Sequence, residues 1–229
     1  MGKRLMQIFI GLIGLILLLA AAGFIYQRMA TARGATAYPP PGQLIDVGGH
    51  QLHIHCLGEG EPTLIVDTGA ADWSLSWLTL HPKLAKQTRT CLYDRAGLGW
   101  SEPGPMPRAS KQLVTELHTL LNNANIEPPY ILLGHSLGGY NARIFHEQFP
   151  DEVRGIILLD SAHEKQWEQF PTAVSDLVTQ QVGLLQSMTT LSQLGIALSA
   201  AGTSSFNGRF AAGLCSTCST RPAICGVGQ

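Results

Sequence analysis

The feature that most constrains the fold is a serine flanked by glycines between a strand-like and a helix-like segment. The apolar run 130–133 leads into Gly134-His135-Ser136-Leu137-Gly138, and the helix-like segment 140–145 follows directly. In a strand–turn–helix corner of this kind the serine lies on a sharp bend, with its hydroxyl raised clear of the sheet. Glycines fit there because side chains would clash where the helix crosses the strand. Ser136 is therefore the candidate nucleophile.

Strand-like and helix-like segments alternate around this corner. A hairpin is expected from 43–47 and 51–57, and further strands are expected at 63–66, 90–93 and 155–159, the last of them buried. The spacing of apolar residues predicts helices at 77–86, 110–123 and 140–149. Such alternation produces βαβ units, so the sequence predicts an α/β domain with a mostly parallel sheet flanked by helices.

The N-terminus carries a long apolar segment. Lys3 and Arg4 precede residues 5–26, which contain no charge and a single polar residue. That length crosses a bilayer as a helix. A cleaved signal peptide is the alternative, because 20–23 has the small residues of a cleavage site, but the apolar core is long for a signal peptide. We favour an anchor, with a cytoplasmic N-terminus and the domain on the outer side.

Composition and cysteine placement narrow the function classes. A chain of 229 residues supports one well-buried domain, and its net charge of -1 gives no reason to expect a nucleic-acid partner. Cys56 and Cys91 lie alone in strand-like runs and are expected as buried thiols. Cys215 and Cys218 resemble half of a zinc site or a redox pair, but no second ligand pair and no βαβ context accompany them, so neither a metal nor a redox role is expected. The sequence does not indicate an oligomeric state.

The expected domain organisation follows from these segments. It consists of a membrane anchor (1–27), a Pro-rich linker (28–42), an α/β core (43–164), a partial helical cap (165–200) and an irregular tail (201–229) expected to be disordered.

Residues 43 to about 164 resemble the first part of an α/β-hydrolase fold domain. The resemblance rests on the hairpin and on four motifs in the family's order: Asp67-Thr68-Gly69-Ala70 after a strand, Tyr93-Asp94-Arg95-Ala96-Gly97-Leu98-Gly99-Trp100-Ser101, Gly134-His135-Ser136-Leu137-Gly138-Gly139, and Asp160 closing a strand. The resemblance implies a serine hydrolase of the esterase type. It also implies a small-molecule acyl substrate and no metal or organic cofactor.

The family also implies where the oxyanion donors lie. One is the backbone N–H of the residue after the nucleophile, Leu137, and the other comes from the loop after the third strand, where we assign it to Ala70. Because both are backbone groups, the absence of the His-Gly sequence common in this loop need not matter.

Several other polar residues are expected to be structural. Asp94 is expected to bond backbone N–H groups of its own Gly-rich turn. His135 adjoins the nucleophile but is expected to shape the turn. His53 and His55 alternate with apolar residues and are expected on a solvated strand face.

The catalytic acid and base are the difficulty. The family places an acid and then a histidine after the serine in the chain. Asp160 and His163 keep this order but are too close in sequence for the usual pair. We therefore expect a C-terminally truncated hydrolase, and a reading-frame change near residue 200 is one hypothesis for its origin.

Two functions follow from this sequence. The first is a membrane-anchored serine hydrolase that cleaves an ester or related acyl bond through an acyl-enzyme on Ser136. The alternative is a truncated, inactive fragment or a non-catalytic binding module of the same fold.

Overall fold

The computed structural model describes residues 2–70 and 72–174, and beyond these only 176–177, 179–181, 184 and 191. The N-terminal helix and the sheet belong to two separate compact units, which divide between Pro39 and Pro40.

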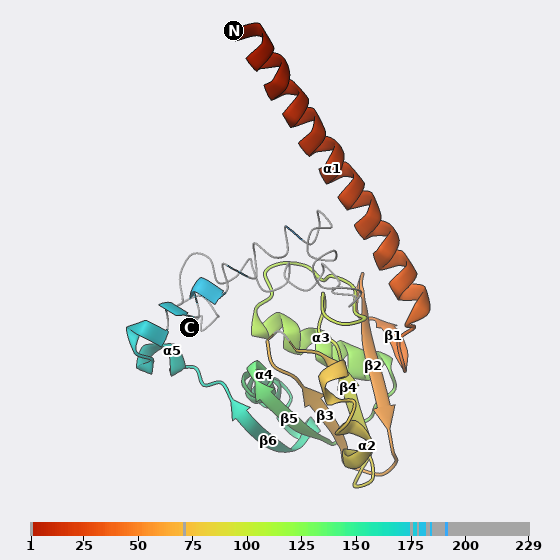
Figure 1. The fold of residues 1–229 in the computed structure, drawn as a ribbon. Coiled ribbons are helices and arrows are strands. Elements are labelled where there is room, and N and C mark those ends of the chain that lie inside the picture. Colours follow the sequence, from red (N-terminus) through yellow and green to blue (C-terminus); the bar gives the residue numbers. More distant parts are fainter. Residues whose placement is uncertain are drawn as a thin grey trace. The chain divides into compact units, whose positions relative to one another are not determined.

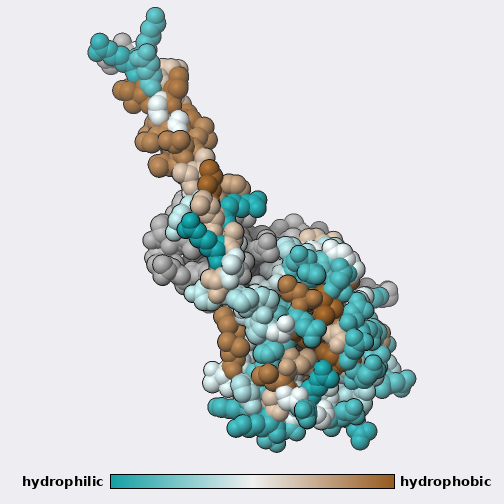
Figure 2. Space-filling view, turned by 90° about the vertical axis from the view of Figure 1, so that its right-hand side faces the viewer, coloured by the Kyte–Doolittle hydropathy of each residue, from teal (hydrophilic) through white to brown (hydrophobic). Residues whose placement is uncertain are grey.

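Helix α1 (Gly2–Ala37) forms most of the described part of the first unit. Over Gly2–Gly34 it is long and apolar enough to cross a membrane, and an 18-residue window within it has a mean hydropathy of 2.8. Signal sequences share this property. Its visible surface is mostly apolar, with hydrophilic residues at the N-terminal tip (Figure 2). The helix continues to Ala37, so the predicted linker 28–42 is wrong over most of its length. Alanine favours helix, and the first residues that stop it are Pro39 and Pro40.

The second unit is built on one six-stranded sheet (Figure 1). Its strands are β1 (Gln43–Asp46), β2 (Gln51–Leu57), β3 (Thr63–Asp67), β4 (Thr90–Tyr93), β5 (Tyr130–Ser136) and β6 (Val153–Ser161), in the order β1-β2-β4-β3-β5-β6. The pairs β1–β2 and β2–β4 are antiparallel, and the other three pairs are parallel. The predicted α/β class with a mostly parallel sheet is confirmed.

Two apolar clusters form because successive strand residues face opposite sides of the sheet. Helices α3 (Ser110–Asn123) and α4 (Leu137–Gln148) cover one side, where Phe145 packs with Ile65. The 3-10 helix η1 (Ser74–Trp77) and helix α2 (His81–Leu84) lie on the other, where Trp77 packs with Leu64 and Val66. This packing holds β3 and β5, whose ends carry the site, between two helical layers.

The predicted helix 77–86 is replaced by η1 and the four-residue α2. Pro82 explains the break, because it has no N–H to donate and occupies the start of α2. The expectation of a buried strand at 155–159 is also wrong. Ile157, Leu158 and Leu159 are about half exposed, because β6 is the last strand of the described sheet.

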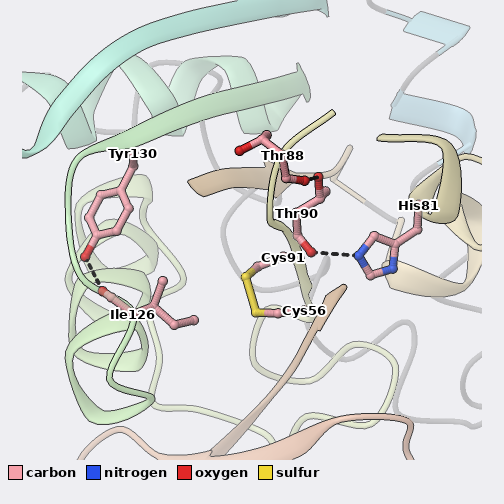
Figure 3. The surroundings of a disulfide bond; sticks show 7 residues. All are labelled: Cys56, His81, Thr88, Thr90, Cys91, Ile126 and Tyr130. Atoms are coloured by element: carbon pink, nitrogen blue, oxygen red, sulfur yellow. Dashed lines mark hydrogen bonds between the residues drawn. A yellow bond between two sulfur atoms is a disulfide. The ribbon is translucent and has the colours of Figure 1, made fainter. Parts of the chain in front are cut away.

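Cys56 and Cys91 form a disulfide, so the prediction of free thiols is wrong (Figure 3). They are direct partners across the antiparallel pair β2–β4, with their Cα atoms 4.0 Å apart. The pairing of β2 with β4 was not predictable from the sequence, because β3 lies between these strands in the chain but not in the sheet. The disulfide lies on the sheet face covered by α3 and α4.

After β6 the described structure is short. It includes helix α5 (Gln166–Gln169), while the 3-10 helix η2 (Pro150–Glu152) precedes β6. Most of the predicted cap 165–200 and the whole tail 201–229, with Cys215 and Cys218, lie outside the described residues.

Candidate active site

Ser136 occupies a strained bend between β5 and α4. Its backbone has φ 52° and ψ -118°, which residues with a side chain rarely adopt. A methyl group on Gly138 would overlap the carbonyl oxygen of Asp67, and one on Gly134 would overlap Gly139. The glycines therefore let the helix cross close to β3 and β5, as predicted, and the bend holds Ser136 at the end of the sheet.

The loop after β3 lies beside this bend. A Cβ atom built on Gly69 would be 3.6 Å from Cβ of Ser136 and 3.3 Å from Nδ1 of His135. Ala70, the next residue, is exposed. The loop after β3 is therefore a direct neighbour of the Ser136 side chain.

A buried ionic network supports the loop. The Arg95 guanidinium contacts the carboxylate of Asp67 and donates to the carbonyl oxygens of Thr68 (2.8 Å) and Gly69. The other carboxylate oxygen of Asp67 accepts a hydrogen bond from Asn141 Nδ2, on α4, at 2.9 Å. The network thus joins the loop to the helix that follows Ser136.

Asp94 organises its own turn, as predicted. Its carboxylate accepts backbone N–H groups from Ser74 (2.8 Å) and Trp100 (3.1 Å), and it contacts Nδ1 of His53 at 2.9 Å. Asp94 and His53 are fully buried, so the expected solvated position of His53 is wrong. His53 does alternate with apolar residues along β2, but the strand face that carries it is covered by the turn after β4.

The family follows from this order of elements and from a direct match. A family model described as the alpha/beta hydrolase fold matches residues 62–201. This chain belongs to the α/β-hydrolase family.

Curated relatives and solved structures agree with that assignment. The Bacillus subtilis protein YbdG is 28% identical over 167 residues, which cover 72% of this chain and 51% of that protein. The epoxide hydrolase CorEH matches with a TM-score of 0.56 and 20% identity, covering 75% of this chain and 73% of that one. A thermophilic esterase from Thermogutta terrifontis matches with a TM-score of 0.53 and 21% identity, covering 69% of this chain and 57% of that one. The structural matches show the fold. This hydrolase-family chain spans about half the length of YbdG.

The α/β-hydrolase sheet brings Asp160 to the same edge as Ser136 but does not pair it with His163. Ser136 is in register with Ser161, and Asp160 is the extra residue of an irregularity there, with φ 43°. The His163 side chain is two-thirds exposed; its Nδ1 accepts the backbone N–H of Lys165, and its Nε2 lies 3.5 Å from Glu164. Within the described part of the chain, no histidine is hydrogen-bonded to the Ser136 hydroxyl.

His135 takes a place between the loop and η1. Its ring faces Trp77 with centroids 6.4 Å apart, and its buried Nδ1 has no hydrogen-bond partner among the described residues. The ring therefore fills space beneath the loop, consistent with the expected turn-shaping role. Across the described ranges, no group of three or more His, Cys, Asp or Glu side chains is arranged to hold a metal ion.

Sequence reasoning did not find the support provided by Arg95 and Asn141. Arg95 follows Asp94 in the Gly-rich motif quoted above. A charged side chain within such a turn was the one signal that could have indicated a buried ion pair. Asn141, five residues after Ser136, resembles any polar helix residue in the sequence.

Proposed function

We propose that this chain is a membrane-anchored serine hydrolase that cleaves an ester or a related acyl bond through an acyl-enzyme on Ser136. One observation carries the proposal: Ser136 holds a strained backbone at the junction of β5 and α4, beside the loop after β3. Strain of this kind persists only where surrounding structure enforces it, and it concentrates at functional sites. A serine here also separates the chain from relatives that use aspartate at this position to open epoxides.

In the proposed reaction the Ser136 oxygen attacks the acyl carbon, and the proton that it gives up leaves with the alcohol when the intermediate collapses. The tetrahedral oxyanion is held by the backbone N–H groups of Leu137 and Ala70. Leu137 begins α4, so its N–H is one of the helix's first donors and has no partner within the helix. Collapse of the intermediate expels the alcohol, and water then releases the acid from the acyl-enzyme.

A second candidate function is a non-catalytic binding module of the same fold. It is favoured by the geometry of His163, which contacts its neighbours Glu164 and Lys165 rather than Ser136. A serine without a base attacks slowly, since removing one member of a triad lowers the rate by several orders of magnitude. We therefore assign the role of base to none of the described residues.

Helix α1 and the disulfide support one location for the domain. The helix has the length and composition of a single membrane span. The Cys56–Cys91 bond lies within the domain, and structural disulfides persist in oxidising compartments. We therefore propose that the N-terminus is cytoplasmic and the domain lies on the outer side.

Labelling by a fluorophosphonate probe, which reacts with activated serines, tests the proposed function. The full chain in detergent is expected to be labelled, Ser136→Ala to lose the label, and Ser161→Ala to keep it, since Ser161 lies at the same sheet edge without the strained bend. An unlabelled wild-type chain, or equal labelling of Ser136→Ala, would favour the binding module.

A further inference from the structure

We infer that Arg95 is a positioning residue that aims the backbone N–H of Ala70 at the reacting oxygen. The inference rests on the proposed function, because it concerns the second oxyanion donor of that site. It assigns a role to the buried arginine of the turn after β4.

Arg95 is placed to fix two consecutive peptide groups. It is 5% exposed, and its guanidinium reaches the carbonyl oxygens of both Thr68 and Gly69 while contacting Asp67. A planar guanidinium holds several acceptors in fixed directions at once, which a lysine ammonium does not. The two carbonyl groups are therefore held towards Arg95.

The direction of the Ala70 N–H follows from peptide geometry. The bond between Gly69 and Ala70 is trans. In a trans peptide the carbonyl and the following N–H point in opposite directions. Because the Gly69 carbonyl points at Arg95, the Ala70 N–H points away from it, out of the buried network.

The network also fixes the loop relative to the nucleophile. Asp67 is bound by Arg95 on one side and by Asn141 on the other, and Asn141 belongs to the helix that starts directly after Ser136. Gly69 adjoins the Ser136 side chain. The backbone N–H of Asp72 also donates to the Gly69 carbonyl oxygen, at 3.1 Å, so Arg95 and this turn together set the direction of the donor and its position beside Ser136.

The test compares Arg95 with a second buried arginine. Arg108 is 7% exposed in its side chain and pairs with Glu116 on α3, so Arg108→Met removes a buried ion pair outside the loop. Arg95→Met, Arg95→Lys and Arg108→Met are compared with the wild type. Two measurements are made: fluorophosphonate labelling, which gives the saturating rate and the half-saturating probe concentration, and hydrogen exchange of the peptide containing 67–72.

Arg95→Met is expected to lower the saturating labelling rate at least tenfold, in line with the loss of one oxyanion donor, with little change in half-saturation. Exchange at the Asp72 amide, which donates to the Gly69 carbonyl oxygen at 3.1 Å, should rise because the loop is held less firmly. Arg95→Lys should restore part of the rate, whereas Arg108→Met should alter neither measurement. Where Arg95→Met does not fold, Arg95→Lys is the test, and its labelling rate is expected to lie between the wild-type rate and a tenth of that rate.

Labelling of Arg95→Met at the wild-type rate, or an equal loss in Arg108→Met, would overturn the inference. A wild-type chain that is not labelled at all contradicts the proposed function instead. In that case hydrogen exchange alone tests Arg95: unchanged exchange at the Asp72 amide in both Arg95 variants rejects its role, and a rise confined to them supports it.

Discussion

Asn141 donates a hydrogen bond from Nδ2 to Oδ2 of Asp67 at 2.9 Å, and both side chains are buried. This bond connects the loop after β3 with the helix after Ser136. Removing the donor leaves a buried carboxylate oxygen without its partner, a change that costs about 1–3 kcal/mol. We therefore predict that Asn141→Ala lowers the free energy of unfolding by about 2 kcal/mol.

Asn123→Ala is the matched control in chemical denaturation. Asn123 also donates from Nδ2, to the carbonyl oxygen of Asp46 at 2.8 Å, but the bond is exposed. Its removal should change the free energy of unfolding by less than about 1 kcal/mol, since water replaces the donor. Equal losses of unfolding free energy in the two variants would show that the buried bond to Asp67 stabilises the fold no more than the exposed bond does.

The backbone of Ser136 makes a separate prediction about stability. Strain at a non-glycine residue in this conformation lowers the stability of the folded state by about 1–3 kcal/mol. Glycine relieves that strain, but its more flexible unfolded chain costs about 0.5–1 kcal/mol of stability relative to alanine. Ser136→Gly should therefore unfold with a free energy about 1 kcal/mol higher than Ser136→Ala. Denaturation of the two variants checks this, and a less stable glycine variant would contradict a strained bend.

The bend itself was predictable from sequence, because glycine, serine and the change from strand to helix all lie within ten residues. The hairpin and the alternating strands were predictable for the same reason, since their periodicity is local. Both features depend only on near neighbours in the chain.

Contacts between distant segments were not predictable in the same way. The Cys56–Cys91 bond depends on β2 pairing with β4, and the burial of His53 depends on the turn that carries Asp94. Arg95 and Asn141 meet at Asp67 only after three elements have packed. A single sequence shows the residues of such networks but not their pairing.

Acid is expected to weaken the domain through His81. Nε2 of His81 donates to the carbonyl oxygen of Thr90 at 2.8 Å, so the neutral ring carries its proton there. The buried Nδ1 has no partner among the described residues, and burial lowers the pKa of His81 below 6.5. Burial, followed by the nearby His81 and His53, also lowers the pKa of His55, whose ring lies 5.1 Å from that of His81.

The direction of the pH effect follows from these shifts. The unfolded chain takes up protons at the ordinary pKa of 6.5, above the lowered folded values, so stability is full above pH 6.5 and falls as pH drops below it. Melting temperature between about pH 7.5 and 5 should show this decline. His81→Gln should flatten it, whereas the exposed His146→Gln should not. An unchanged slope in His81→Gln contradicts the assignment.

The disulfide between β2 and β4 should contribute measurably to stability. It closes a loop with a sequence separation of 35 residues, for which chain entropy gives about 3–4 kcal/mol. We predict that a reducing agent lowers the melting temperature of the wild type. The double variant Cys56→Ala and Cys91→Ala should melt at that lower temperature with or without reductant. A wild type that is insensitive to reductant would show that the bond is absent or unimportant.

The most direct test of the central claim is to find where an acyl group attaches. The full chain is mixed with p-nitrophenyl acetate, quenched in acid, and mapped by peptide mass spectrometry, with Ser136→Ala as control. We predict acetyl on Ser136 and none on the corresponding peptide of the variant. Released p-nitrophenol without acetylated Ser136, or the same acetylated residues in both proteins, would contradict Ser136 as the nucleophile.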